Sequence, residues 1–188
     1  ALERVEIRPL RRNLPFAVAG QTIRLSIPGP GQYSVEVGGS HHALHLFANP
    51  PAEYKARPGD LYFGPGEHVA GLIWPQSNQT VIFDEGAVVY GAIYARGVEN
   101  VRIVGRGILD SSIYRRGNDV EPDQPGGEVL RDMLAHGLDE WHARAAGTVS
   151  IDGCTNVIME GVILRDSMCW ALTTLNECRL LSIDNVKI

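Results

Sequence analysis

Two similar stretches of the chain carry an Asp-Ser pair at the same place, Asp110-Ser111 and Asp166-Ser167. Each pair begins nine residues after the first apolar residue of its stretch, Val101 or Val157. If the stretches stack as neighbouring strands, strand spacing brings the two carboxylates to roughly 4.8 Å, where they would form part of a substrate groove. The alternative interpretation is turn capping, because Asp and Ser side chains hydrogen-bond readily to nearby backbone groups.

The tryptophans offer a second kind of binding chemistry. Trp170 follows the second Asp-Ser pair, and its ring is a candidate to stack on a bound ligand. The alternative is packing into the protein wall, as is common for a Trp within a strand. Trp141 and His142 end a helix-like segment and are placed to reach over the groove, whereas Trp74 is expected to seal a corner.

No metal site and no cofactor are predicted. His41 and His45 would share one face of a strand while His42 points to the other, and no carboxylate or thiolate stands at a supporting spacing. The cysteines lack a C-x-x-C spacing and allow at most one disulfide, and buried free thiols are the favoured interpretation. They are Cys154, Cys169 and Cys178.

The composition is that of an ordinary globular protein with many turns. The 188 residues include 21 Gly and 11 Pro, and 44% of them are hydrophobic. The formal net charge of −5, without a continuous basic stripe, argues against nucleic-acid binding. No apolar run approaches the length of a membrane-spanning helix, so no membrane association is predicted. The chain begins at Ala1 rather than Met, which is compatible with a removed leader.

A short repeated segment organises the chain from residue 80 onward. Its copies read TVIFDEGAVV, NVRIVGRGIL, NVIMEGVIL and LLSIDNVKI, beginning at Thr80, Asn100, Asn156 and Leu180. Aligned residues are 20, 56 and 24 positions apart, which fits turns of roughly 20–25 residues with an insertion in the long interval. Strands returning at such a period predict a parallel β-solenoid.

Two apolar columns run through the copies. The first holds Val81, Val101, Val157 and Leu181. The second lies seven positions further on and holds Val88, Ile108, Leu164 and Ile188. Along each strand, many of the residues between or beside these apolar positions are polar. This alternation is expected when one face of a strand packs inside and the other meets solvent.

Other positions in the copies predict the turns between strands. Four residues after the first column, a left-handed backbone is expected to bend the chain. These positions are Glu85, Gly105, Gly161 and Asn185. Asn100 and Asn156 each precede a strand, so their amides are predicted to stack as a ladder between turns.

The remaining segments complete the predicted organisation. Residues 1–50 alternate polar and apolar side chains between Pro- and Gly-rich turns, which predicts a small antiparallel β-sandwich. A polar, proline-rich linker follows at 51–58, and the solenoid occupies 59–188. Within it, about 112–147 is predicted to be an inserted loop with a short amphipathic helix, because 126–141 has apolar residues at helical spacing.

These motifs together resemble a known family. Phe63–His68, the copy at Asn100–Asp110, and Cys154–Trp170 resemble the beginning of the pectinase-type right-handed parallel β-helix, although Met168 replaces the proline of the family's Ser-Pro-x-Trp segment. The most similar groups are the polygalacturonase-like glycoside hydrolases of family 28 and the dextranase-like enzymes of family 49. The latter also carry an N-terminal β-sandwich. The expected fold is therefore all-β, a right-handed parallel β-helix preceded by a small antiparallel β-sandwich.

The resemblance implies a secreted or periplasmic, inverting hydrolase of an α-linked polysaccharide such as polygalacturonate or dextran. Such enzymes hold an acid and a base carboxylate about 6.5–9.5 Å apart. The family's Asn-Thr-Asp, Asp-Asp, Gly-His-Gly and Arg-x-Lys motifs do not occur in this chain. In the family they follow the equivalent of Leu180–Ile188, so catalytic residues are expected beyond Ile188 and this segment alone is expected to be inactive. Asp110, Asp166 and Trp170 are the candidate substrate-binding residues.

Two other functions are alternatives, and the first of them stays open. An open final turn at Ile188 predicts further chain or self-association, since unpaired strand edges readily pair. This fits a non-catalytic β-helix module that binds glycans or builds a fibre, as in phage tailspikes. A pectate-lyase-like enzyme would need a calcium site, for which the loop acids Asp119, Glu121 and Asp123 supply too few ligands.

Overall fold

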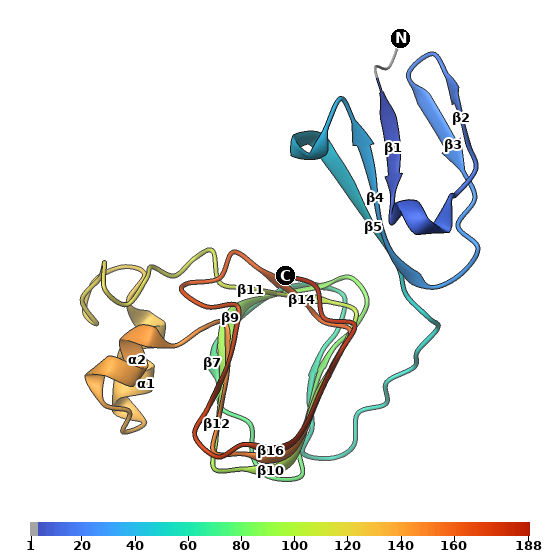
Figure 1. Ribbon diagram of the computed structural model, residues 1–188. Helices are drawn as coiled ribbons and strands as arrows, with labels where there is room; N and C mark the ends of the chain where they lie inside the picture. The colour runs from blue at the N-terminus through green and yellow to red at the C-terminus, as the bar shows by residue number, and fades with distance from the viewer. Residues whose placement is uncertain (1–3) are drawn as a thin grey trace. The chain divides into compact units, whose positions relative to one another are not determined.

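The computed structural model describes residues 4–188, and the chain divides into two compact units, Ala1–Ala52 and Glu53–Ile188. Each unit is mostly β-structure (Figure 1). Among the described residues, no helix combines the length and the apolar character that crossing a membrane requires.

The first unit contains two antiparallel sheets. Strands β1 (Val5–Arg8), β4 (Gly31–Val37) and β5 (Ala43–Ala48) form one sheet in the order β1-β4-β5. Strands β2 (Phe16–Ala19) and β3 (Thr22–Leu25) form a separate hairpin. Short 3-10 helices lie at Leu10–Arg12 and Ser40–His42.

The core of the first unit is small. Ile7, Tyr33 and Val35 are its buried apolar residues among those described. All residues of β2 are exposed, so the structure does not show the predicted packing of one sheet on another as a sandwich. The alternating segments of the sequence correspond to β1, β3, β4 and β5, while β2 was not predicted.

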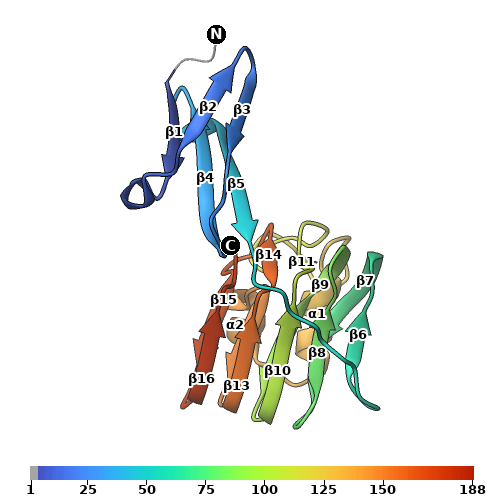
Figure 2. The ribbon, with the colours of Figure 1, turned by 90° about the vertical axis from the view of Figure 1, so that its right-hand side faces the viewer.

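The first sheet of the second unit is wholly parallel. Its order, β16-β13-β10-β8-β6, follows the order of the chain, and Figure 2 shows these strands side by side. The strands are β6 (Leu61–Phe63), β8 (Thr80–Phe83), β10 (Glu99–Gly105), β13 (Thr155–Glu160) and β16 (Arg179–Asp184). Each strand therefore pairs with the equivalent strand of the preceding and following turn.

The second sheet is built around one long strand, β9 (Ala87–Arg96). The first half of β9 pairs with β11 and its second half with β12, both in parallel. The sheet order is β14-β11-β9-β12-β15, and β7 also pairs with β9. The strands are β7 (Gly66–Ile73), β11 (Ile108–Asp110), β12 (Val149–Asp152), β14 (Ile163–Arg165) and β15 (Leu172–Leu175).

The two parallel sheets curl around one apolar core. Figure 1 looks along the stack, so successive turns of the chain overlie one another. Phe83, Ile93, Ile103 and Ile151 are among the side chains fully enclosed there. Removing a side chain of this size from water stabilises the fold by about 1.5–3 kcal/mol, so alignment of the turns is strongly specified.

The observed registers confirm most of the first predicted column and correct the rest. Val101, Val157 and Leu181 lie opposite one another as predicted. Val81 lies opposite Ile103 rather than Val101, a shift of two residues. Because side chains alternate with a period of two, this shift keeps the same strand face inside, and the sequence pattern could not exclude it. In the second column, Ile108 pairs with Ile163, so the enclosed column is Val89, Leu109 and Leu164.

The predicted asparagine ladder is present and includes one more member. Asn100 Nδ2 donates to Asn78 Oδ1 at 3.0 Å, and Asn156 Nδ2 donates to Asn100 Oδ1 at 2.7 Å. All three residues have left-handed backbone, with φ of 67°, 57° and 56° in chain order. Asn tolerates this conformation better than other residues with a Cβ, which explains its recurrence at these positions. Asn78 precedes β8, whereas Asn100 and Asn156 are the second residues of β10 and β13 rather than preceding them as predicted. The next turn has Leu180 at this position, also with positive φ.

The turn at the other end of these strands depends on glycine. A Cβ on Gly105 would lie 1.8 Å from the carbonyl oxygen of Phe83, and its φ is 138°. Gly161 and Asn185 also have positive φ, as predicted. In the earliest copy the left-handed residue is Gly86 rather than Glu85, one position later than predicted.

The inserted segment forms two short helices rather than one. They are α1 (Glu128–Ala135) and α2 (Glu140–Ala145), separated by Gly137, which has positive φ. Buried residues of both helices pack with Ala92 and Tyr94 on the outer face of β9, while Ile93 and Ala95 point into the main core. The helices therefore cover part of the second sheet from outside (Figure 1).

Asn100→Ala removes both ladder hydrogen bonds and places a less tolerant residue in left-handed backbone. We expect the free energy of unfolding to fall by about 2 kcal/mol, with roughly equal contributions from the hydrogen bonds and the backbone. Asn100→Gly is the matched control, because Gly loses the amide but adopts positive φ freely. Urea unfolding should rank wild type first, Gly second and Ala last. An Ala variant as stable as wild type would contradict the ladder.

Candidate functional site

Asp110, a predicted substrate-binding residue, is fully buried at the end of β11. Its Oδ1 accepts a hydrogen bond from the backbone N–H of Ser112 at 2.7 Å, and its Oδ2 is paired with Arg165. Burial opposes ionisation, but the hydrogen bonds from Ser112 and Arg165 outweigh it and lower the pKa of Asp110. This geometry is a capped turn bonded to the next turn of the chain.

Asp166 does not form the predicted carboxylate pair with Asp110, and Trp170 lies on the surface. Asp110 pairs in register with Arg165, so Asp166 is one position further along and is exposed, with φ of 49°. Trp170 is 61% exposed, and its carbonyl oxygen accepts from Thr148 N–H at 2.9 Å. The structure therefore does not bring Asp110 and Asp166 to equivalent places, but it leaves the indole of Trp170 open to solvent.

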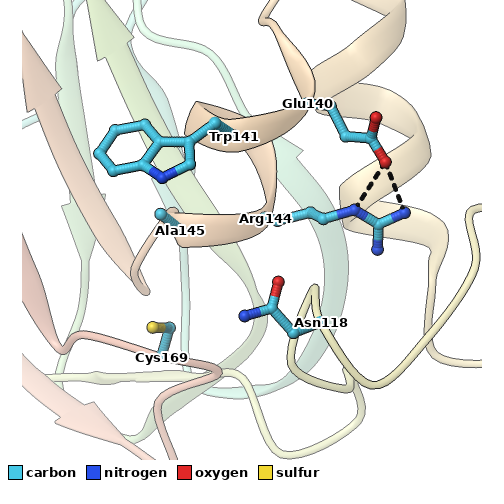
Figure 3. A pocket seen from close by; sticks show the side chains of 6 residues that line it. All are labelled: Asn118, Glu140, Trp141, Arg144, Ala145 and Cys169. Atoms are coloured by element: carbon cyan, nitrogen blue, oxygen red, sulfur yellow. Dashed lines mark hydrogen bonds and ion pairs between the residues drawn. The ribbon is translucent and has the colours of Figure 1, made fainter.

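A pocket of about 420 Å³ lies between α2 and two loops (Figure 3). Its volume is within the range of small-molecule sites, about 300–1,000 Å³. The lining residues are Asn118, Glu140, Trp141, Arg144, Ala145 and Cys169. In Figure 3 the indole of Trp141 and the amide of Asn118 lie on different sides of this space. The indole is 68% exposed, unlike the buried apolar residues of the helices.

Arg144 connects the loop before α1 to α2. Its Nε donates to Glu140 at 3.0 Å, and its Nη2 lies 2.9 Å from Glu140 and 3.3 Å from Glu121. Its Nη1 donates to the carbonyl oxygens of Val120, at 3.1 Å, and Gly117. The hydrogen bond to Glu140 raises the pKa of Arg144, so the guanidinium stays charged.

Asp139 orders the first turn of α2. Its side chain accepts the backbone N–H of His142 at 3.1 Å, which is helix N-capping, and also contacts His142 Nδ1 at 2.5 Å. The His142 ring packs edge-on against Trp141 with centroids 4.9 Å apart. The cap therefore positions the exposed indole through His142.

The base of the insertion is held by buried polar contacts. Ser111 Oγ lies 2.9 Å from Thr148 Oγ1 and donates to the Gly91 carbonyl oxygen, also at 2.9 Å. Ser111 and Thr148 flank the inserted residues on either side, so this contact closes the insertion at its root. The pocket is thus carried on a segment attached firmly to β9.

A smaller polar cluster lies between α2 and the second sheet. Asp152 accepts from Asn176 Nδ2 and, at 3.3 Å, from the hydroxyl of Tyr94, and lies 3.6 Å from Arg96 Nε. Burial and the charge of Asp152 raise the pKa of Tyr94 to about 12, so this hydroxyl remains protonated and donates. Because Asp152 is bonded to groups of β9 and to Asn176 after β15, the cluster joins neighbouring turns of the second sheet.

The structure also bears on the histidines and acidic residues, the cysteines and Trp74. Among residues 4–188 no group of three or more His, Cys, Asp or Glu side chains could hold a metal ion. The three cysteines are free thiols, but only Cys154 is buried as predicted, whereas Cys169 and Cys178 are half-buried. Trp74 stacks between Tyr94 and His136, at 5.3 and 4.6 Å, so it packs beneath the helices rather than sealing a corner.

Several residues of the pocket were not predicted from the sequence. Asn118, Glu140, Arg144 and Cys169 received no role, although Glu140 and Arg144 have the four-residue spacing of a helical ion pair. The Asp-x-x-His spacing of Asp139 and His142 could likewise have suggested a helix cap. The approach of Asn118 and Cys169 to α2 depends on tertiary structure alone.

Comparison with known proteins supports a distant glycoside hydrolase-like fold. No protein family model matches the chain, and no curated protein sequence does. The chain is similar to the structure of a proposed glycosyl hydrolase from Parabacteroides merdae, with 26% identity and a TM-score of 0.50, covering 68% of this chain and 58% of that chain.

A second solved structure, a family 28 exopolygalacturonase from Yersinia enterocolitica, is 12% identical with a TM-score of 0.50. The match covers 87% of this chain and 45% of that chain, and at this identity it shows the fold alone. This chain therefore spans about half the length of the solved structures it matches.

Asp110→Asn tests whether Asp110 is structural. Loss of its charge weakens the contact with half-exposed Arg165, so we expect the free energy of unfolding to fall by about 1–2 kcal/mol at pH 7. Because the pKa of Asp110 is lowered on folding, this stabilisation is present above the ordinary value of 3.8 and is lost as the pH falls further. Unfolding curves of the two proteins should converge in acid. Equal stability at pH 7 would argue against the structural role.

Asp139→Ala should loosen α2, whereas Asp139→Asn should retain the helix cap. The hydrogen bond from the backbone N–H of His142, and then the contact with its imidazole, lower the pKa of Asp139. The stabilisation that the Asp139 carboxylate supplies is therefore present at pH 7 and is lost as the pH falls through this lowered pKa. We expect a lower melting temperature and faster amide exchange in α2 for the Ala variant at pH 7. Unchanged exchange in both variants would show that the cap does not order the helix.

Proposed function

We propose that the protein acts in the hydrolysis of an α-linked polysaccharide, by the inverting reaction that two carboxylates perform. The observation that carries this proposal is the pocket with the exposed Trp141, held on stacked parallel strands whose fold is like that of glycoside hydrolases. Indole rings bind the apolar face of a sugar, and amides such as that of Asn118 suit its hydroxyl groups.

Within this proposal, residues 59–188 form the first turns of a right-handed parallel β-helix. Three features support it. Strand order follows chain order in the first sheet, every strand pair of the second unit is parallel, and asparagine amides stack between turns. Polygalacturonase-like and dextranase-like activities are the candidates, and a protein with such a substrate would act outside the cytosol, after secretion or in the periplasm.

The proposal assigns glycan binding to the surface around α2 and the exposed indole of Trp170. Trp170 follows Cys169 of the pocket, and a Cβ on Gly147 would lie 2.3 Å from its carbonyl oxygen. Gly147 comes shortly after the end of α2, so the backbone at Trp170 packs beside the segment that carries Trp141. The hydrolytic activity is proposed for the whole protein, and its acid and base carboxylates are left unassigned.

Incubation of the purified full-length protein with dextran, pullulan and polygalacturonate tests this activity. We expect new reducing ends from at least one polymer, and NMR of the first products should show the β-anomer, because inversion of an α-linkage produces it. Heat-denatured protein is the control. Binding to a polymer without release of reducing ends would instead support the non-catalytic glycan-binding alternative.

A further inference from the structure

The charge balance of the pocket points to the class of sugar it accepts. An acidic sugar such as galacturonate needs a cation with free N–H donors, which arginine supplies best in a bidentate geometry. Arg144 is the cationic lining residue of the pocket. Whether an acidic sugar fits therefore depends on the existing partners of Arg144.

The guanidinium of Arg144 is already bonded on each of its nitrogens. Nε and Nη2 face the carboxylates of Glu140 and Glu121, and Nη1 faces the carbonyl oxygens of Gly117 and Val120. The Arg144 side chain is only 19% exposed, while those of Glu140 and Glu121 are 70% and 62% exposed. An entering carboxylate would thus meet two exposed negative groups before it could displace any bond to Arg144.

The surrounding insertion has the same sign of charge. Residues 112–147 contain seven acidic side chains and four arginines. A segment with an excess of acidic side chains repels a polyanion, over a distance set by ionic strength. A polyanionic glycan is therefore disfavoured both at the pocket and on approach to it.

The uncharged part of the pocket is suited to a neutral sugar. Trp141 presents an exposed ring whose orientation is fixed through His142 and Asp139, and the amide of Asn118 offers a donor and an acceptor. Figure 3 shows both groups bordering the same space, with the Glu140–Arg144 pair to one side. A ring and an amide recognise hydroxyl-bearing pyranoses without requiring charge.

From these observations we propose that the Trp141 pocket is a binding subsite for an uncharged hexose unit of a neutral polysaccharide, and that acidic polysaccharides are excluded from it. The inference rests on the proposed function, because it names the substrate class of that same surface. It would assign the protein to neutral glucans rather than polygalacturonate.

Titration calorimetry of the full-length protein with isomalto-oligosaccharides, malto-oligosaccharides and oligogalacturonides tests the proposal. We expect binding of at least one neutral series and none of the oligogalacturonides. Trp141→Ala should weaken the binding of neutral sugars about tenfold, because loss of an aromatic contact of about 1.4 kcal/mol corresponds to a factor of ten in affinity. Trp141→Phe should restore part of this binding. Tyr62→Ala is the matched control, since Tyr62 is 50% exposed on β6 in the other parallel sheet.

A charge variant tests the exclusion of acidic sugars separately. Glu121→Gln removes an exposed negative group from Arg144, and we expect it to introduce weak oligogalacturonide binding while leaving neutral binding within about twofold. Circular dichroism confirms that each variant is folded.

Tighter binding of oligogalacturonides than of neutral sugars by the wild-type protein would overturn the proposal. So would neutral binding that Trp141→Ala leaves unchanged, or no binding of any series. These results are distinguishable from failure of the proposed function, because hydrolysis is measured independently by reducing ends. A protein that binds neutral sugars through Trp141 but cleaves none would retain the subsite and lose only the activity.

Discussion

Parallel pairing between successive turns is the constraint on which the second unit depends. Each strand of the first sheet hydrogen-bonds to its equivalents in neighbouring turns, so a residue's contacts are largely with the same position in the next turn. In such stacks stability is a sum of similar interfaces, and equivalent side chains meet directly. The asparagine ladder and the enclosed column of Val89, Leu109 and Leu164 both follow from this geometry.

The same constraint explains why the pocket lies outside the stack. The interior is filled with apolar side chains, and the turns between strands are short, so little space remains for binding. The insertion supplies that space by packing its helices against the outward residues of β9. It also brings its own charges, of which Arg144 is paired with both Glu121 and Glu140, so an excess of negative charge remains. The pocket is thus separated physically from the enclosed core that stabilises the stacked turns.

The sequence predicted the repeated strands, the ladder and the helical insertion because each leaves a local pattern. It predicted the register of Val101, Val157 and Leu181 but not that of Val81, since apolar alternation cannot distinguish Val81 opposite Ile103 from Val81 opposite Val101. Asp110 and Asp166 stand at the same distance from Val101 and Val157 in the sequence, but, counted from the paired positions, the turn before β14 is one residue shorter than the turn before β11, so Asp110 lies opposite Arg165. The pocket was only partly foreseen. Trp141 was noted, but its approach to Asn118 and Cys169 joins segments with no shared pattern.

The closure of the insertion by Ser111 and Thr148 has a consequence for how the segment can be altered. Because its two ends are already bonded together, lengthening the segment adds only a slowly growing entropic cost, about 0.6 kcal/mol for each doubling. No strand of the two parallel sheets lies within this segment, so strand pairing between neighbouring turns does not run through it. We therefore expect that the segment between these two residues can be lengthened or replaced at a small cost in stability, and that new ligand-binding groups can be introduced there without a change in strand pairing.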